Sequence, residues 1–434
     1  MTTNTQHPNA ALARRVLGAI ERRPAPDEAA ALARGRPREL AVRLLDGAAA
    51  VDEPEPWLRP RLRDLRRLRS RQRRLAQDAL FAAIRHRDLI GHVASTRSDE
   101  LWTGALVLMA GLEPPPGFEG LARADVLDDW AATASSVEVL ALAGGLPSFL
   151  VQHLVDDRGA DEAEALVVAL LGRAPTTLRA NATRCDREKL ARRLGREGIR
   201  TRPADHAAGA LHLEGTANLA GSPTFRSGWF EVQDEASQLG AALVTPAPGL
   251  VVDLCCGAAG KSLALDLHPA ARLVGFDTRG RALEAGRARA RRAGRRMELH
   301  QLQPGEAPSL PPGCASRVLV DAPCTGTGSL RRAPTRRWSL DEARLASAVA
   351  QQDALLDRAA ALLAPGGELV YLTCSLLRRE NDERVAAFLA RWPRFRAKPV
   401  TAPADVVDGE FLRVDPHRHG CDGFFGAVLV ASDP

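Results

Sequence analysis

Lysine is scarce in this chain of 434 residues, and so are tyrosine and methionine. Lys189, Lys261 and Lys398 are its lysines, so nearly all of the positive charge is carried by arginine. The net charge of +6 permits a polyanionic partner such as a nucleic acid. The high content of alanine and arginine also indicates a bias in codon usage. Arginine content alone is therefore weak support for nucleic-acid binding.

Long apolar runs are missing as well, so no membrane span is expected. The first residues, Met1 to Gln6, lack the charged and then apolar pattern of a signal peptide. The seven cysteines are scattered and odd in number, which argues against a disulfide framework and against a metal site. We expect a cytoplasmic monomer that binds neither metal nor membrane.

The chain is too long for one ordinary hydrophobic core, and its pattern of apolar and polar residues changes twice along the sequence. Residues 1–165 have the apolar spacing of helices and predict an all-helical domain. Residues 172–229 alternate short strands and helices and predict a small α+β module. Residues 230–434 begin with an expected helix over 231–243 and then alternate strands with helices. They predict an α/β domain of Rossmann-like type, with a parallel sheet wrapped by helices.

An arginine-rich segment at residues 57–80 stands out within the helical part. Its leucines recur at helical spacing, which predicts one helix with an apolar face and basic remaining faces. One interpretation is a surface that contacts phosphates. The other is a solvated helix face in a protein rich in arginine, and the sequence leaves both open.

Two expected strands each deliver a thiol to their carboxyl end. The apolar run 317–320 is followed by Asp321 and Cys324, and the run 368–373 is followed by Cys374. Ligands of open α/β sheets bind beyond the carboxyl ends of strands, so this pattern indicates a catalytic site. The alternative is that the cysteines are small buried apolar residues and that Asp321 caps the next element.

A third strand, expected at 250–254, opens into a glycine-containing loop followed by an expected helix from Lys261. Glycines let the backbone approach a ligand closely, and Asp277 at the end of the next strand is placed to bind ribose hydroxyls or to cap a helix. The loop lacks both the dinucleotide and the phosphate-clamping signatures, which favours S-adenosylmethionine over NAD or ATP. The candidate cofactor residues are Asp277, Asp321 and the loop residues Cys255, Cys256, Gly257, Ala258, Ala259, Gly260 and Lys261.

Thiols and an acid suit one reaction in particular. A thiolate can add to C6 of a cytosine, which makes C5 nucleophilic towards a methyl group. A carboxyl group can hydrogen-bond to the ring, and a base must then remove the C5 proton. Cys374, Cys324 and Asp321 are the candidate catalytic residues, and either thiol could be the nucleophile.

The motifs Asp253–Lys261, Asp321–Gly328, Thr373–Ser375 and Val232–Gln238 resemble those of the Sun/RsmB-type RNA 5-methylcytosine methyltransferases. The resemblance covers roughly residues 175–434 and includes 417–425 as the last strand. It implies a methyltransferase domain in which Cys374 attacks, Cys324 assists release and Asp321 contacts the cytosine. The loop and Asp277 would hold S-adenosylmethionine. The helical part corresponds in position to an RNA-binding, NusB-like domain.

The resemblance implies ribosomal RNA as the substrate, with transfer RNA as the alternative. Two positions depart from the family pattern. Ala259 replaces a usual loop glycine, and an acid usual after the third strand is missing, where Gln303 or Glu306 would have to substitute. Two rival functions use the same features differently. They are a DNA cytosine methyltransferase and a non-catalytic RNA-binding factor of ribosome assembly.

Overall fold

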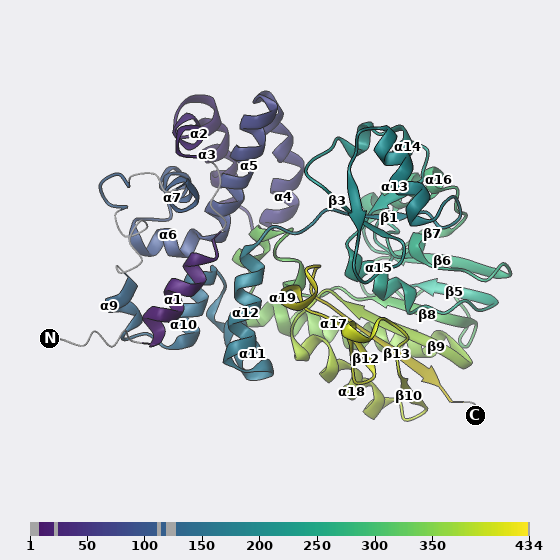
Figure 1. The fold of residues 1–434 in the computed structure, drawn as a ribbon. Helices are drawn as coiled ribbons and strands as arrows, with labels where there is room; N and C mark the ends of the chain where they lie inside the picture. The colour runs from purple at the N-terminus through teal and green to yellow at the C-terminus, as the bar shows by residue number, and fades with distance from the viewer. Residues whose placement is uncertain (1–7, 21–24, 111–113, 119–126, 433–434) are drawn as a thin grey trace. The chain divides into compact units, whose positions relative to one another are not determined.

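The computed structural model describes residues 8–20, 25–110, 114–118 and 127–432. The expectation made for Met1 to Gln6 lies outside these residues. The chain forms two compact units, one of residues 1–173 with 330–344 and one of residues 174–329 with 345–434 (Figure 1). Within the described ranges, no helix is long and apolar enough to cross a membrane.

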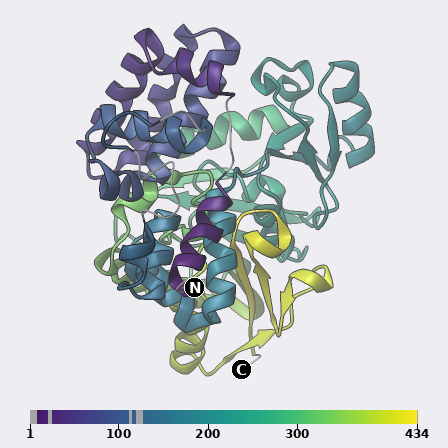
Figure 2. The ribbon, with the colours of Figure 1, turned by 60° about the vertical axis from the view of Figure 1, so that its left-hand side comes forward.

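The first unit is helical throughout its described part, and Figure 2 shows its helices from a second side. Apolar residues at helical spacing bury one face of each main helix around a core that includes Leu44, Leu80 and Trp102. The helices are α1 (Pro8–Gly18), α2 (Pro26–Leu32), α3 (Gly35–Ala49), α4 (Pro54–Arg61), α5 (Ser70–Arg85), α6 (Arg87–Val93), α7 (Ser98–Ala110), α9 (Asp128–Ala131), α10 (Ser136–Gly144), α11 (Ser148–Arg158) and α12 (Ala160–Leu171).

The single arginine-rich helix expected over residues 59–74 is wrong. α4 ends at Arg61, a 3₁₀ segment runs over Leu62–Arg67, and α5 begins at Ser70. Pro60 lies inside α4 and weakens its continuation, and Leu68 turns extended so that its side chain is buried. Eight of the nine arginines of the segment still face solvent, namely Arg59, Arg61, Arg63, Arg66, Arg67, Arg69, Arg71 and Arg74.

The second unit begins with a small antiparallel sheet of order β2-β3-β1-β4. Its strands are β1 (Thr177–Ala180), β2 (Thr201–Pro203), β3 (Ala210–Leu213) and β4 (Phe230–Val232). Helix α13 (Arg187–Arg196) packs Leu190 and Leu194 against Leu178 and Phe230 of this sheet. Strands and a helix around one core confirm the expected α+β character of this stretch.

The large sheet has the order β11-β12-β13-β9-β8-β5-β6-β7, and β10 pairs with β13. The pairs among β5 to β9 are parallel, and those of β13 are antiparallel. This confirms the α/β class. The strands are β5 (Gly249–Asp253), β6 (Ala271–Asp277), β7 (Glu298–Gln301), β8 (Ala315–Asp321), β9 (Leu363–Thr373), β10 (Phe395–Lys398), β11 (Val407–Asp408), β12 (Phe411–Val414) and β13 (Phe424–Ala431).

Side chains alternate between the two faces of this sheet, and each face is covered by helices. Val318 and Val320 share a core with α17 (Glu342–Leu362) and α18 (Asp382–Arg391). Leu319 belongs to the core on the opposite side, which includes α15 (Glu235–Ala242). Helix α16 (Gly280–Ala293) packs beside β6 and β7. Burial on both faces explains why the strands read as nearly continuous apolar runs.

Two expected helices of this domain need correction. The helix expected over 231–243 begins only at Glu235, because residues 230–232 pair with β1 as β4. The helix expected from Lys261 is absent, and only a 3₁₀ turn at Ser262–Ala264 forms. Leu265 then becomes extended with its side chain buried, and its carbonyl accepts a hydrogen bond from Arg295 at 2.5 Å. The glycine loop therefore leads into a turn, not into a helix amino terminus.

Candidate active site

The loop after β5 is tied to both neighbouring strands by its backbone. Leu254 N donates to Leu319 O of β8, and Cys256 N donates to Phe276 O of β6, each at 2.9 Å. Gly257 has a φ of 53° and Ala259 a φ of 59°, so the loop makes a tight turn in the left-handed region. That conformation is easy for glycine and costs an alanine about 1–2 kcal/mol. Burial of the Ala259 side chain helps to hold this strained residue.

Cys255 and Cys256 lie in this loop, and their surroundings favour the protonated form of both thiols. Burial raises the pKa of the Cys255 thiol well above its usual value, and the nearby charge of Asp253 raises it further. Burial raises the pKa of Cys256 in the same way. Both thiols are therefore held protonated, and protonated thiols are poor nucleophiles.

Asp277 ends β6 beside this loop and is almost fully buried. Its Oδ2 accepts a hydrogen bond from Gly257 N at 2.8 Å, which draws the loop towards the carboxylate. Burial alone would raise the pKa of Asp277, but hydrogen bonds from the Arg279 side chain and backbone lower it below its usual value. The structure thus brings Asp277 and the glycine loop together at one strand edge.

The two thiols that the sequence places at strand ends meet in the structure. Cys324 Sγ and Cys374 Sγ are 3.4 Å apart, and both side chains are partly exposed. Their strands β8 and β9 are parallel neighbours, so their carboxyl ends lie at the same edge. The hydrogen bond with Cys374, together with burial, raises the pKa of Cys324 well above its usual value. Cys324 is therefore held as a neutral thiol beside Cys374.

Lys261 links the loop after β5 (residues 255–261, the cofactor loop) to the site of the two thiols, Cys324 and Cys374. Its Nζ donates to Asp321 Oδ2 at 2.7 Å. Burial lowers the pKa of Lys261, but the charge and hydrogen bond of Asp321 and the nearby charge of Cys374 outweigh burial and raise it. The ammonium group is therefore present at neutral pH, and a cation beside a thiol favours the thiolate.

Glu380 is a positioning residue whose role the sequence does not reveal. Its buried carboxylate accepts from Thr325 N at 2.8 Å and from Gln352 Nε2 at 3.0 Å. It also accepts hydrogen bonds from the hydroxyls of Thr325 and Ser375. Thr325 follows Cys324 and Ser375 follows Cys374, so one carboxylate fixes the chain on both sides of the thiol pair. Glu380 lies only five positions after Ser375, but nothing in this spacing predicts the contacts with Thr325 and Gln352.

Two glycines bring three segments of the site into backbone contact. Gly328 N donates to Cys374 O, and Gly423 N donates to Gly328 O, each at 2.9 Å. A Cβ atom added at Gly328 would lie 2.2 Å from Gly423 O, which no side chain can occupy. Glycine is required at Gly328 because two backbones pass each other there.

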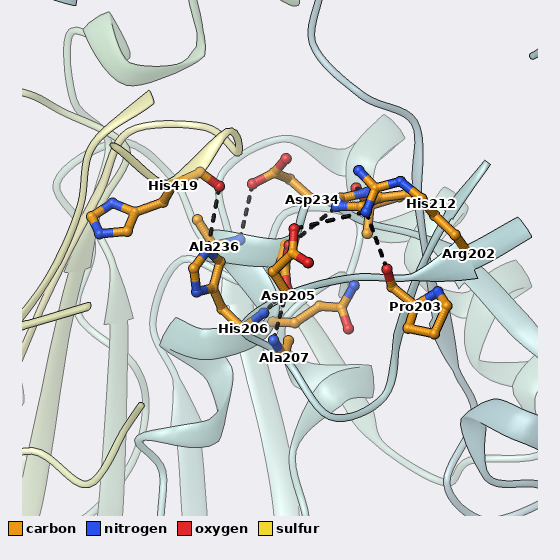
Figure 3. A network of polar contacts seen from close by, with 12 residues as sticks. Arg202, Pro203, Asp205, His206, Ala207, His212, Asp234, Ala236 and His419 are labelled. Atoms are coloured by element: carbon orange, nitrogen blue, oxygen red, sulfur yellow. Dashed lines mark hydrogen bonds and ion pairs between the residues drawn. The ribbon is translucent and has the colours of Figure 1, made fainter. Parts of the chain in front are cut away.

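A polar network joins the small sheet to the segment before β13 (Figure 3). The buried Glu235 accepts hydrogen bonds from His206 N and Ala207 N at 2.5 and 2.7 Å. His206 Nε2 lies 3.3 Å from His419 O, and Asp422 N donates to Asp234 at 3.2 Å. These contacts explain why two motifs almost 190 residues apart belong to one site.

The loop and Asp277 fit a nucleoside cofactor. A Cβ atom at Gly257 would lie 3.3 Å from Arg279 Nη2 and 3.9 Å from Asp277 Oδ2, so glycine at this position keeps a side chain away from the carboxylate. Gln303 and Glu306 are the two candidates to replace the acid that is missing after the third strand. Gln303 N donates a hydrogen bond to the Glu306 carboxylate at 2.6 Å. In the part of the chain that the structure describes, no group of three or more metal-ligating side chains converges.

Comparison with known proteins identifies the family. Residues 242–430 match the family described as 16S rRNA methyltransferase RsmB/F, and residues 146–220 match its ferredoxin-like domain. The small subunit rRNA methyltransferase B of Xanthomonas campestris is 34% identical over 66% of this chain and 66% of its own length. A probable enzyme of the same kind from Bacillus subtilis is 33% identical over 71% of this chain and 70% of its own length. The chain thus spans about two thirds of the length of these relatives.

The solved structure of the protein PH0851 superimposes with a TM-score of 0.76 at 22% identity, covering 91% of this chain and 99% of that one. The sheet, the loop and the match define an S-adenosylmethionine-dependent methyltransferase with a Rossmann-like domain, a small α+β module and a helical amino-terminal region. The chain belongs to the RsmB/F family of rRNA methyltransferases.

Proposed function

We propose that this protein methylates C5 of a cytosine in RNA, most simply in ribosomal RNA of the small subunit, as the names of its relatives suggest. The observation that carries the proposal is the pair of thiols at 3.4 Å beside the Lys261–Asp321 pair. A methyltransferase acting on an oxygen or an exocyclic nitrogen needs no thiol. An electron-poor ring carbon needs one to become nucleophilic. An RNA of the ribosome places the reaction in the cytoplasm.

In this proposal Cys374 is the nucleophile. The Cys374 thiolate forms a bond to C6 of the cytosine, and the electron pair of the C5–C6 double bond moves to the C5 side of the ring. Asp321 can accept a hydrogen bond from the exocyclic amine, and the Lys261 ammonium can donate a hydrogen bond to the ring, which stabilises the added charge. C5 then takes the methyl group, which S-adenosylmethionine supplies from its sulfonium as it becomes S-adenosylhomocysteine.

Release completes the sequence. A base removes the C5 proton, its electrons restore the C5–C6 bond, and the C6–S bond breaks with the Cys374 thiolate as leaving group. Cys324 is the group placed to assist this step, because it lies next to Cys374 on the neighbouring strand.

Methyl transfer with labelled S-adenosylmethionine tests the reaction. The RNA of ribosomal small subunits from cells lacking the gene should accept label, and nucleoside mass spectrometry should identify 5-methylcytidine. Bisulfite sequencing of total RNA from cells with and without the gene should locate the cytosine. Methylation of a DNA oligonucleotide in preference to RNA, or of transfer RNA alone, would favour the corresponding rival substrate. No turnover with any of these acceptors would favour a non-catalytic factor of ribosome assembly.

A further inference from the structure

Every hydrogen-bonding position of the Asp277 carboxylate is filled from within the chain. Oδ1 accepts from Arg279 N and from Arg279 Nε, each at 2.9 Å. Oδ2 accepts from Gly257 N at 2.8 Å and from Arg279 Nη2 at 3.0 Å. An ionised carboxylate has about four acceptor positions, so none remains for the two hydroxyls of a ribose.

The four donors are not equivalent. Gly257 N and Arg279 N are backbone groups held by the loop and by the start of α16. The two guanidinium donors sit on a side chain that is 70% exposed and can leave for water, whereas the Asp277 side chain is only 5% exposed. Departure of the guanidinium would free one acceptor position on each carboxylate oxygen. That is the arrangement that a vicinal diol requires.

We infer that the Arg279 guanidinium occupies the place of the cofactor ribose on Asp277 and is exchanged for the ribose 2′- and 3′-hydroxyls when the cofactor binds. Arg279 is a positioning residue that competes with the ligand. The exchange of an exposed ion pair for two hydrogen bonds lowers cofactor affinity and assists product departure, because the guanidinium returns as the diol leaves. The glycine at 257 keeps the same space open for both groups, since a Cβ atom there would crowd Arg279 Nη2.

This inference rests on the proposed role of Asp277 in cofactor binding. The variant Arg279→Met keeps the length of the side chain and the backbone donor but removes both guanidinium donors. We expect it to bind adenosine and S-adenosylhomocysteine about two- to fivefold more tightly than the unchanged protein, the scale of an exposed ion pair. Both ligands carry no net charge, so the loss of an arginine charge does not by itself favour them.

Calorimetry or competition binding on the full chain gives the measurement. The control Arg281→Met removes an exposed arginine from the first turn of α16, two positions after Arg279, and should leave both affinities unchanged. The gain should vanish for 2′,3′-dideoxyadenosine, which has no diol to exchange. In Arg279→Met, unchanged or weaker adenosine binding would overturn the inference, and so would an equal gain for the dideoxy ligand.

The variant Asp277→Asn separates this inference from the proposed site. It should weaken adenosine binding and leave dideoxyadenosine binding nearly unchanged. If Asp277→Asn weakens adenosine binding and Arg279→Met does not strengthen it, the ribose site stands and the competition by Arg279 is wrong. If neither variant changes adenosine binding, Asp277 does not bind the ribose, and the assignment of the cofactor site falls with this inference.

Discussion

At the scale of single residues, burial of the Asp253 carboxylate makes the stability of the folded protein depend on pH. Its side chain is buried beneath the cofactor loop, and it accepts hydrogen bonds from Ser262 Oγ at 2.5 Å and from Cys255 N at 3.2 Å, neither of which is a cation. Burial raises the pKa of Asp253 from 3.8 to about 7. The folded protein therefore retains a proton on Asp253 at pH values where the unfolded chain has lost it.

The sign of the pH dependence follows from this difference. Between about pH 4 and pH 7 the folded state binds more protons, so the free energy of unfolding falls as pH rises through this window. A shift of one pKa unit corresponds to about 1.4 kcal/mol, so the free energy of unfolding can fall by at most about 4 kcal/mol across this window. Relative to Asp253→Asn, the unchanged protein should lose stability from pH 4 to 7 and change little above. Urea unfolding of both proteins measures this, and a stability difference independent of pH would contradict it. The exposed Asp205→Asn serves as control.

The sequence predicts that the candidate site residues lie at one edge of the sheet, but it does not predict their hydrogen-bond partners. Cys324 and Cys374 follow strands that the apolar pattern reveals, and parallel strands bring their ends together. The pairing of Lys261 with Asp321 crosses 60 positions and depends on the loop conformation, which periodicity does not encode. Asp277 is predicted to bind ribose, and the structure shows its acceptor positions filled by Arg279 and Gly257. Side-chain pairing of this kind follows from the fold and leaves no pattern in the chain.

At the scale of elements, α16 is held against the cofactor loop by a glycine. A Cβ atom at Gly286 would lie 3.2 Å from Ala259 Cβ and 3.3 Å from the backbone of Ala258. Gly286→Leu should push the loop outward and weaken S-adenosylhomocysteine binding, because overpacking costs about 1–3 kcal/mol. Ala288→Leu adds the same side chain to an exposed position of the same helix and should have no effect. Equal affinity of the two variants in calorimetry would show that the loop tolerates displacement.

The helix expected after Lys261 illustrates what local pattern misses at this scale. Ser262 to Leu265 is compatible with helix, but Asp253 holds Ser262 Oγ and burial draws Leu265 into an extended conformation. Tertiary interactions thus override helix propensity. The regular alternation of strands and helices in this domain can be predicted from apolar periodicity alone. The structure confirms this alternation, as β6, α16 and β8 show.

The exposed arginines between α4 and α5 permit a test of the phosphate-contact interpretation. Changing Arg63, Arg66 and Arg67 together to Gln should weaken RNA binding if these side chains contact phosphates. The slope of log K against log salt should flatten by about 0.7–0.9 for each phosphate that is no longer neutralised. The matched triple change to Lys keeps the charge and should keep the slope. Filter binding over a salt series measures it, and an unchanged slope in the Gln variant would favour the compositional interpretation.

At the scale of the whole molecule, residues 330–344 leave the methyltransferase part of the sequence and fold with the helical unit. Arg337 is buried there and donates to the carbonyls of Gly144, Gly145 and Leu170 at 3.3, 3.4 and 3.3 Å. These carbonyls lie at the ends of α10 and α12, where the helix dipole is negative. Burial lowers the pKa of Arg337 to about 9, so it remains charged at neutral pH.

Removal of this arginine should destabilise the helical unit. Arg337→Ala leaves three carbonyls without this donor, and a buried polar group left unsatisfied costs about 1–3 kcal/mol. Arg344→Ala removes an exposed arginine that lies 3.6 Å from Glu53, and it should cost about 1 kcal/mol or less. Thermal or urea unfolding followed by a probe in the helical unit makes the comparison. Equal stability of the two variants would show that Arg337 does not anchor the segment.

The central claim, that Cys374 attacks and Cys324 assists release, is tested most directly by denaturing electrophoresis of each variant after incubation with RNA and S-adenosylmethionine. Cys324→Ala should accumulate a covalent protein–RNA adduct, because attack and methyl transfer proceed and release does not. Cys374→Ala should form no adduct and transfer no methyl group while it still binds cofactor, and the double variant should also form none. An adduct in Cys374→Ala with none in Cys324→Ala would reverse the two roles, and full activity in both variants would contradict the mechanism.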